Sequence, residues 1–548
     1  MNLLGYLRMR PLISGHWLIV AVAVYCVGFL NFRFFFNLTA VYPFSLENVI
    51  FTLSIAMLSV CVNVFLFALV CIGPVRKLLL ITVLLASALA AYFMDSYNVI
   101  LDQVMMQNVM QTNLAEARDL LSGKLALYFL LLGGLPALLV GWVRVKPIGL
   151  WRRVFVTHLA LLIAPLAIMA GLIMLSSGYY ASFFRDHKTL RAYANPSYYI
   201  YSTIKYVSGY FKNTPDALSP LGEDARIPAW DIHRELIIFV VGETARADRF
   251  QLNGYQRPTN PYLSKENVIS LRNFWSCGTS TSVSVPCMFS LHQAGEYDAE
   301  KAQSAENLLD VLEHAGVHVL WRDNNSDSKG VAERVPQQDF KSPQSNPDCD
   351  VECRDLGMLS GLQDYIDRQA AGDVFVVLHQ MGNHGPAYYK RYPANFEVFK
   401  PACHTNQLES CSKEEIDNAY DNAILYTDYF LAQVINLLKK NDSRFETALF
   451  YVSDHGESLG EYGLYLHGLP PAIAPDVQRH VPAIFWFGSH FDDIDLAKLR
   501  RETGKKYTHE NVFHTILGLM EIETAIYDAS QDIIPHENEE GEHTMESE

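Results

Sequence analysis

The positions of the apolar residues divide the chain into two unlike parts. From Pro11 to about Leu175 long apolar segments dominate, whereas from Asp224 onward apolar and polar residues mix as in a water-soluble globular domain. Several segments come close to the roughly 20 apolar residues that a membrane-spanning helix needs. They cover residues 12–32, 49–72, 78–94, 125–143 and 154–175. The pattern therefore predicts an N-terminal five-helix transmembrane domain.

The charges around these segments predict their orientation. Three sites flanking the segments carry the basic residues Arg8, Arg10, Arg76, Lys77, Arg144, Lys146, Arg152 and Arg153. Short loops rich in Lys and Arg lie on the cytoplasmic side, so an odd number of spans places everything after Leu175 on the opposite side. The first segment is longer than the apolar core of a signal peptide, which indicates a retained anchor.

The remaining part has the pattern of an α/β domain. Short runs of continuous apolar residues predict strands that are buried on both faces, as in a parallel sheet covered by helices. These runs are residues 236–241, 317–321, 374–378, 448–452 and 481–487, and the predicted helices are 304–316, 356–368 and 414–440. We expect a largely parallel sheet between helices.

An aromatic connector separates the two parts. Aromatic side chains, frequent in residues 176–228, favour the interface between lipid and water, so we expect this segment to lie on the membrane. The predicted boundaries are 1–175 for the five spans, 176–230 for the interfacial helix and linker, 231–535 for the globular domain and 536–548 for an acidic tail. With a net charge of −16, the chain is expected to bind no nucleic acid, and we expect a monomer.

The cysteines agree with an external domain. Cys26, Cys61 and Cys71 lie inside predicted spans, and the others are near neighbours in the globular domain. Short loops favour the local disulfides Cys277–Cys287, Cys349–Cys353 and Cys403–Cys411, which persist in an oxidising compartment. The alternative is a structural zinc site formed by Cys349, Cys353, Cys403 and Cys411, which the predicted topology disfavours.

Candidate metal ligands follow three predicted strands. Glu243 follows the first run, His379 and His384 follow the third, and Asp454 and His455 follow the fourth. Parallel strands gather their carboxyl ends at one edge of a sheet, where α/β domains build their sites. Carboxylate and imidazole ligands suit zinc and also admit manganese. We therefore predict a metal held by Glu243, Asp454 and His455.

A hydroxyl-rich segment is the candidate source of a nucleophile. Residues 277–290, CGTSTSVSVPCMFS, contain Thr279, Thr281 and Ser282, and spacing alone does not choose among them. Metal coordination lowers the pKa of an alcohol enough to make it nucleophilic. If the segment opens a helix, its N-terminus also favours a bound anion. The combination predicts transfer of a phosphoryl group.

The order of motifs resembles bacterial phosphoethanolamine transferases, most closely the type that modifies lipid A and confers polymyxin resistance. The motifs are GETARADR (242–249), CGTSTSVSVPCMFS (277–290), DNNSDSKG (323–330), HQMGNHGPAYY (379–389) and SDHGESLGEYGLYLHG (453–468). The resemblance covers nearly the whole chain. It implies an inner-membrane protein with five spans, an interfacial connector and a periplasmic domain of alkaline phosphatase/sulfatase type.

The resemblance also implies roles for individual residues. Thr281 would be the nucleophile and a zinc ligand, together with Glu243, Asp454 and His455. His384 and His467 would hold the phosphoryl group or assist the leaving alcohol, with one zinc or two, and Lys329 would contact the phosphate. The residues do not show whether His379 reaches the site or is a core histidine.

The reaction implied by the resemblance is a two-step transfer. Thr281 would take phosphoethanolamine from phosphatidylethanolamine and release diacylglycerol, and a phosphate of lipid A would then attack the phosphothreonine. Asn108, Thr112 and Glu116 recur every four residues in an external loop that reads as helical. The resemblance implies that they line the site for the lipid headgroup; a solvated helix face is the alternative.

Three other classes share part of this pattern. Sulfatases use a C-x-P-x-R or S-x-P-x-R motif, which residues 277–290 lack. Related phosphotransferases that act on the lipopolysaccharide core or polymerise glycerol phosphate are closer, although the cysteine pairs and HQMGNHGP argue against the latter. A membrane-anchored binding or transport protein with a structural metal is disfavoured because structural zinc prefers cysteine-rich ligands.

Overall fold

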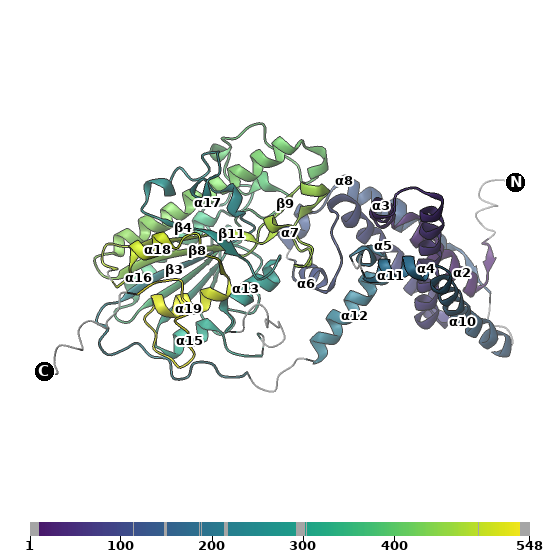
Figure 1. The fold of residues 1–548 in the computed structure, drawn as a ribbon, viewed down its shortest axis with the longest axis horizontal. Helices are drawn as coiled ribbons and strands as arrows, with labels where there is room; N and C mark the ends of the chain where they lie inside the picture. The colour runs from purple at the N-terminus through teal and green to yellow at the C-terminus, as the bar shows by residue number, and fades with distance from the viewer. Residues whose placement is uncertain are drawn as a thin grey trace. The chain divides into compact units, whose positions relative to one another are not determined.

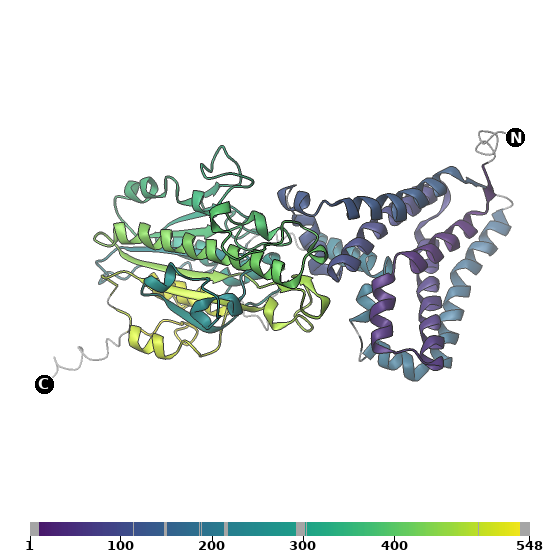
Figure 2. The same ribbon diagram turned by 90° about the horizontal axis from the view of Figure 1, so that it is seen from above.

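The computed structural model describes two compact units of the chain (Figures 1 and 2). The described residues are 10–112, 114–146, 151–185, 187, 189–212, 218–291, 302, 304–491 and 493–536. The first unit contains the chain up to Gln107 and Leu121–Ser208; the second contains Asn108–Leu120 and the chain from Gly209 onward.

The first unit is a bundle of apolar helices. Its α-helices are α2 (Gly15–Phe29), α3 (Phe32–Val41), α4 (Leu46–Val70), α5 (Arg76–Tyr97), α8 (Gly123–Tyr128), α9 (Leu135–Trp142), α10 (Trp151–Leu175), α11 (Ser177–Arg185) and α12 (Ser197–Lys212). A π-helical segment, Phe129–Gly134, joins α8 to α9, and the short strands β1 (Leu12–Ile13) and β2 (Arg144–Val145) pair in parallel.

Four helices of the described residues are long and apolar enough to cross a membrane. They are Leu46–Val70, Gly73–Tyr97, Gly123–Trp142 and Phe155–Leu175. The pair α2 and α3, bent by 57°, counts as a fifth span if it is taken as one. The structure thus confirms an N-terminal helical membrane domain of four to five spans.

Part of the aromatic connector packs within this helical unit. The side chain of Asn31, at the bend between α2 and α3, donates to the carbonyls of Cys26 and Asn195 at 2.8 and 2.6 Å. The backbone N–H of Asn195 donates to the Asn31 side chain at 2.9 Å. Tyr180 is buried and its hydroxyl lies 3.1 Å from the Ser54 hydroxyl. The residues around Asn195 are therefore anchored to the helices rather than free as a linker.

The second unit contains an eight-stranded sheet in the order β12-β4-β11-β8-β3-β7-β5-β6. The strands are β3 (Glu235–Gly242), β4 (Ile269–Trp275), β5 (His318–Asp323), β6 (Gln337–Asp339), β7 (Val374–His379), β8 (Glu446–Ser453), β11 (His480–Phe487) and β12 (Tyr507–Thr508). Its central strands β8, β3, β7 and β5 run parallel, as predicted. β11 was expected among the parallel strands but is antiparallel to β8 and β4.

Helices cover both faces of this sheet (Figure 1). Alternate residues of β3 belong to two hydrophobic cores, one on each face of the sheet. Phe239 packs with one set of helices and Ile238 with the other. The first set comprises α13 (Thr281–Phe289), α15 (Leu308–His314), α18 (Leu496–Arg501) and α19 (Glu510–Leu519), and the second comprises α16 (Leu362–Arg368) and α17 (Lys413–Asn441). This confirms the α/β domain that the apolar runs predict.

Capping explains where the principal helices begin. At α17 the Ser412 hydroxyl accepts from the Glu415 N–H at 3.3 Å, and the Glu415 carboxylate accepts from the Ser412 N–H at 2.7 Å. Asn307 and Asp310 form the same reciprocal arrangement at α15. Such caps satisfy backbone donors that have no partner inside the helix. Both helices were predicted, with bounds a few residues wider for α15.

The loop predicted to be one helix is two helices. α6 (Gln103–Gln111) and α7 (Leu114–Asp119) are separated at Thr112, so Asn108 and Glu116 do not lie on one uninterrupted helix face. The side chain of Asp119 pairs with Lys390 and with Arg391, the latter at 2.8 Å. These ion pairs attach α7 to the globular unit.

All predicted disulfides are present. They are Cys277–Cys287, Cys349–Cys353 and Cys403–Cys411, while Cys26, Cys61 and Cys71 are buried free thiols. The alternative of a cysteine zinc site is therefore wrong. The first bridge closes a loop over a sequence separation of 10 that contains the start of α13.

We expect replacement of Cys277 and Cys287 by serine to destabilise the globular unit by about 2–3 kcal/mol, because the closed loop restricts the unfolded chain. The measurement is thermal unfolding of the full-length protein in detergent. The Cys26→Ser variant is the control, since this thiol forms no disulfide. An unchanged melting temperature in the double variant would show that the bridge has no stabilising role.

Candidate active site

Two neighbouring strands place Glu243 and Asp454 side by side. β3 and β8 are parallel, and their last residues, Gly242 and Ser453, are opposite one another in register. The residue that follows each strand is acidic, so the side chains of Glu243 and Asp454 lie at the same edge of the sheet. Both carboxylates are completely buried. The sequence predicted this pairing from the strand ends.

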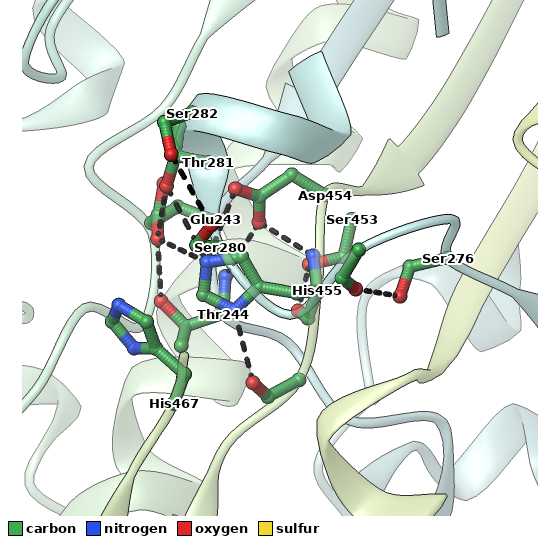
Figure 3. Close-up of polar contacts among 12 residues, drawn as sticks. Glu243, Thr244, Ser276, Ser280, Thr281, Ser282, Ser453, Asp454, His455 and His467 are labelled. Atoms are coloured by element: carbon green, nitrogen blue, oxygen red, sulfur yellow. Dashed lines mark hydrogen bonds and ion pairs between the residues drawn. The ribbon is translucent and has the colours of Figure 1, made fainter. Parts of the chain in front are cut away.

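Helix α13 brings Thr281 to the same point (Figure 3). Ser280 has the extended backbone of a helix cap and Thr281 is the first residue of the helix. The Thr281 hydroxyl donates to Glu243 Oε2 and Oε1 at 3.1 and 3.3 Å and lies 3.4 Å from His455 Nε2. Thr279 instead donates to the Leu469 carbonyl at 2.7 Å. Among the three candidate hydroxyls, the structure places Thr281 against the acidic pair.

The imidazole of His455 is oriented by its backbone. Its Nδ1 lies 3.0 Å from the Gly456 carbonyl, so Nδ1 carries the proton and Nε2 keeps its lone pair. Nε2 lies 3.3 Å from Asp454 Oδ2 and 3.4 Å from Glu243 Oε1. Second partners that fix the ring in this way are typical of metal-binding histidines.

Burial and neighbouring charges shift the pKa values of these groups. Burial raises the pKa of Asp454 well above its usual range, and the neighbouring Glu243 raises it further. The pKa of Glu243 falls to about 2, because His455, His384 and His467 outweigh the effect of burial. Burial lowers the pKa of His455 to about 3. The imidazole is therefore neutral and ready to act as a ligand.

The geometry fits a tetrahedral metal. The ligand atoms of Glu243, Asp454 and His455 lie within 4.8 Å of one another. Ligands at about 2.0–2.2 Å from zinc are separated by about 3.3–3.6 Å in a tetrahedron, and the distances from Thr281 and His455 to their neighbours are 3.1–3.4 Å. Asp454 Oδ2 is buried and has no hydrogen-bond partner among the described residues. Two carboxylates, an imidazole and a hydroxyl form a donor set suited to zinc.

Asn325 holds Glu243 in position and was not predicted. Its side-chain NH₂ donates to Glu243 Oε2 at 2.6 Å and to the Gln380 carbonyl at 2.7 Å. Thr244 donates to the other carboxylate oxygen at 2.9 Å. Asn325 lies two residues after the end of β5, which was the available signal, although an amide is not among the usual metal ligands.

Two further histidines face this cluster. The His467 ring lies 4.3 Å from the His455 ring and 5.6 Å from the His384 ring, centre to centre. His467 Nδ1 lies 3.2 Å from the buried carboxylate of Glu457. Burial lowers the pKa of His384 to about 4. The structure thus brings both predicted histidines together beside the metal-ligand group.

Lys329 and His379 have other partners. The Lys329 ammonium donates to the Ser326 hydroxyl at 2.5 Å and pairs with Asp327 at 3.2 Å. His379 is buried, with Nδ1 3.0 Å from Asp323 Oδ2. This contact favours the core-histidine alternative for His379. The phosphate contact of Lys329 stays a prediction.

The predicted headgroup residues are only partly described. The Ser282 hydroxyl, next to Thr281 in the chain, donates to Asn108 Oδ1 at 2.6 Å. The Thr112 hydroxyl donates to the Asn108 carbonyl at 2.7 Å, a bond within the helical turn. The side chain of Glu116 lies outside the described residues. Asn108 therefore reaches the neighbourhood of the nucleophile.

The fold and the arrangement of Thr281 with its acidic and histidine neighbours define a member of the sulfatase superfamily. Residues 235–522 match the sulfatase family, and residues 59–211 match the family described as phosphoethanolamine transferase EptA/EptB. The second match covers much of the helical unit, from within α4 to within α12.

Full-length relatives define the family more narrowly. The chain is 42% identical to the phosphatidylethanolamine transferase Mcr-1 of Escherichia coli, over 94% of this chain and 96% of that protein. It is similar to the structure of the integral membrane lipooligosaccharide phosphoethanolamine transferase A (EptA) of Neisseria meningitidis. That similarity has a TM-score of 0.91 and 35% identity, and covers 96% of this chain and 99% of that one. The C-terminal periplasmic domain of EptC from Campylobacter jejuni is 41% identical, with a TM-score of 0.51, over 58% of this chain and 97% of that domain.

The chain belongs to the EptA/Mcr family of phosphoethanolamine transferases. It is an enzyme of the inner membrane with its catalytic domain in the periplasm, in agreement with the membrane helices, the basic loops and the three disulfides.

Proposed function

We propose that the enzyme transfers phosphoethanolamine from phosphatidylethanolamine to a phosphate of lipid A through a phosphothreonine at Thr281, and thereby confers resistance to polymyxin and other cationic peptides. The observation that carries this proposal is the contact of the Thr281 hydroxyl with both Glu243 and His455. Names of relatives support the substrates: one is a phosphatidylethanolamine transferase and another acts on lipooligosaccharide.

In the first half of the proposed reaction, Thr281 Oγ1 attacks the phosphorus of the donor. A bond forms between Oγ1 and phosphorus while the bond from phosphorus to the glycerol oxygen breaks. The Oγ1 proton is directed at the Glu243 carboxylate, which accepts it in a hydrogen bond. His467, which contacts the buried Glu457 carboxylate, supplies a proton to the leaving oxygen, so that diacylglycerol departs as a neutral alcohol.

In the second half, an oxygen of the lipid A phosphate attacks the same phosphorus. The bond between phosphorus and Oγ1 breaks, and Thr281 recovers the proton that Glu243 accepted in the first half. His467 takes up the proton of the attacking phosphate, which restores the enzyme, and the product carries a diphosphate linkage. The N-terminus of α13, where Thr281 is the first residue, stabilises the phosphoryl oxygens in both steps because its free N–H groups favour anions.

We propose zinc as the cofactor, held by Glu243, Asp454, His455 and Thr281. When bound, zinc lowers the pKa of the hydroxyl and offsets charge on the phosphoryl group. Glu243 and His455 orient the hydroxyl through the contacts already described. His384 and His467 are proposed to hold the phosphoryl group directly or through a second zinc ion; their ring centres are 5.6 Å apart.

Mass spectrometry of lipid A tests the reaction directly. Cells that produce the enzyme are expected to contain lipid A that is heavier by one phosphoethanolamine. When phosphatidylethanolamine carries a label in its headgroup, the label should leave that lipid and appear on lipid A. If the lipopolysaccharide core is modified and lipid A is not, the result would favour the core as the acceptor. Absence of labelled product in both fractions would contradict the proposal.

We expect Asn325→Leu to weaken zinc binding by about 10–100-fold, as is typical for the loss of a residue that positions a metal ligand. The reason is that Glu243 Oε2 loses the donor at 2.6 Å while all direct ligands remain. Zinc affinity is measured by competition with a chelator. Asn325→Asp, which keeps the shape but places a charge beside Glu243, should weaken binding as well; unchanged affinity in both variants would contradict the positioning role.

We propose that Asn108, Thr112 and Glu116 contribute to the site for the donor headgroup. Asn108 accepts from Ser282, the residue after the nucleophile. Glu116→Ala is expected to raise KM for phosphatidylethanolamine several-fold while zinc content stays the same, because a carboxylate offers an ion pair to the ammonium. A KM equal to that of the unmodified enzyme would remove Glu116 from the headgroup site.

The proposed organisation follows from a lipid donor. We propose a transmembrane domain in residues 1–175, an interfacial segment in 176–230, a catalytic domain in 231–535 and an acidic tail from 536, acting as a monomer. Residues 537–548 lie outside the described part of the chain, and His536 contacts Asp532 at 3.1 Å. Membrane attachment confines the enzyme to the surface where its substrate lies.

A further inference from the structure

A second group of acidic residues lies at the opposite edge of the sheet. Glu235 is the first residue of β3 and Glu446 is the first residue of β8, and the two are opposite one another in register. Asp373 directly precedes β7, the other neighbour of β3. Asp231 and Glu521 complete the group, which we call the basal acidic cluster. It marks the amino ends of the strands whose carboxyl ends lead to the active site.

The carboxylate oxygens in this cluster are close enough to share a cation. Glu235 belongs to two sets of three ligand atoms, each lying within 4.8 Å of one another: Glu235 with Asp231 and Asp373, and Glu235 with Glu446 and Glu521. A shared central carboxylate means that the two sets form one continuous group of oxygen ligands.

Glu235 points into this group and finds no hydrogen-bond donor there. Its side chain is 1% exposed, and neither carboxylate oxygen has a partner within the described part of the chain. Asp231 and Asp373 each use one oxygen to accept a backbone N–H, from His233 at 3.0 Å and from Glu235 at 3.2 Å. Their second oxygens are buried and unpartnered among the residues described. A buried carboxylate in this state destabilises the fold unless a proton or a cation compensates it.

The nearby basic side chains do not fill this role. Arg234 directs its guanidinium to the carbonyls of Gly372 and Gln369. His233 contacts Glu446 at 2.9 Å, but its side chain is 63% exposed. Burial, together with the adjacent Asp373, raises the pKa of Glu235 to about 11. Burial likewise raises the pKa of Asp373, so both carboxyl groups favour their neutral, protonated form unless a cation takes the place of the proton.

We propose that the basal acidic cluster is a binding site for a hard divalent cation, with calcium the expected ion. Calcium takes six to eight oxygen ligands, whereas zinc prefers sites that include nitrogen or sulfur. The cluster offers carboxylates only, and the active site offers an imidazole as well. Glu521 also lines a cavity of about 580 Å³ together with Asp493 and Trp230, so one carboxylate of the cluster faces an open cavity.

A bound cation would hold together the starts of the two strands that lead to the active site. β3 leads to Glu243 and β8 leads to Asp454, and the cluster joins the beginnings of the same strands. Calcium binding therefore stabilises the central sheet without touching the substrate. The inference rests on the residues of the cluster alone, so it is independent of the donor and acceptor proposed above.

Calcium binding to the zinc-loaded full-length enzyme in detergent tests the proposal. After dialysis into calcium-free buffer, radioactive calcium is expected to bind at about one ion per chain with a dissociation constant of about 10⁻⁴–10⁻³ M, the range of extracellular sites. Calcium should raise the melting temperature by several degrees. Both effects should be lost in Glu235→Gln and in Glu521→Gln. Glu521 is only partly buried, so its substitution should disturb the fold less than that of Glu235.

The active-site variant Glu243→Gln separates the two metal sites. It is expected to bind calcium as the unmodified enzyme does, because Glu243 lies at the other end of β3. Calcium bound to Glu235→Gln and Glu521→Gln as tightly as to the unmodified enzyme would overturn the proposal. So would the absence of binding to the unmodified enzyme at millimolar calcium, which would show that protons compensate the cluster instead.

Discussion

Thr281→Ala is expected to lower the rate of phosphoethanolamine transfer by at least about 10⁴-fold, the scale of loss when a catalytic nucleophile is removed. The hydroxyl is the atom that contacts both Glu243 and His455, and alanine leaves nothing to form the bond to phosphorus. The measurement is transfer of labelled headgroup from phosphatidylethanolamine to lipid A in detergent, with folding checked by thermal unfolding.

Two comparisons make this result specific to the nucleophile. Thr281→Ser keeps the hydroxyl and should retain substantial activity. In the absence of acceptor, the unmodified enzyme should accumulate one phosphoethanolamine on the peptide that contains Thr281, detected by mass spectrometry. Full activity of Thr281→Ala, or modification at Ser282 or Thr279 instead, would refute the assignment.

Asp454→Asn is expected to lower zinc affinity by more than about 100-fold and to abolish transfer at ordinary zinc concentrations. Asparagine keeps the shape of the side chain but removes the charge that offsets the cation. Metal content after dialysis, measured by mass spectrometry of the elements, reports the loss of affinity. Removing zinc from the unmodified enzyme with a chelator should give the same loss of transfer, and added zinc should restore it.

Asp428→Asn is the matched control for Asp454→Asn. Asp428 is also completely buried, but it accepts the backbone N–H groups of Tyr262 and Leu263 outside the metal-ligand group. Burial raises its pKa to about 7, so loss of its charge should be tolerated. Zinc content is expected to remain unchanged. Normal zinc affinity in Asp454→Asn would show that Asp454 is no ligand.

The sequence predicts the central sheet well because strands buried on both faces consist of continuous apolar residues. β3, β7 and β8 are buried at every residue, and continuous apolar runs mark all of them. The same pattern says nothing about direction, so the antiparallel course of β11 was missed. β4 alternates between buried and partly exposed residues, and it was not recognised as a strand.

The proposed metal ligands could be predicted for a related reason. Glu243 and Asp454 directly follow buried strands, and parallel register then places them together. The choice of Thr281 needed the family resemblance, since the position of a hydroxyl on the first turn of a helix is fixed by tertiary contacts. Asn325 was missed because an amide gives no sign that it supports a carboxylate from another strand.

The break between α6 and α7 is the feature that the sequence pattern predicts least well. The helical period continues through Thr112 in the sequence, with no glycine or proline to end it. Contacts of Asp119 with Lys390 and Arg391 attach α7 to the globular unit, and such long-range contacts override local helix preference.

The bonds between Thr279 and the segment after His467 have a consequence for substrate choice. Thr279 donates to the Leu469 carbonyl and accepts from the Gly468 N–H, at 2.7 and 2.8 Å. These two bonds tie the backbone just before Thr281 to the backbone just after His467, so the two segments cannot separate without breaking both bonds. In the proposed reaction, the phosphoryl group that binds beside Thr281 and His467 is common to all phospholipids. We therefore expect residues farther from this point, such as Ser282 and Asn108, to select ethanolamine over other headgroups, and substitutions there to change which lipids are consumed before they change the rate of the chemistry.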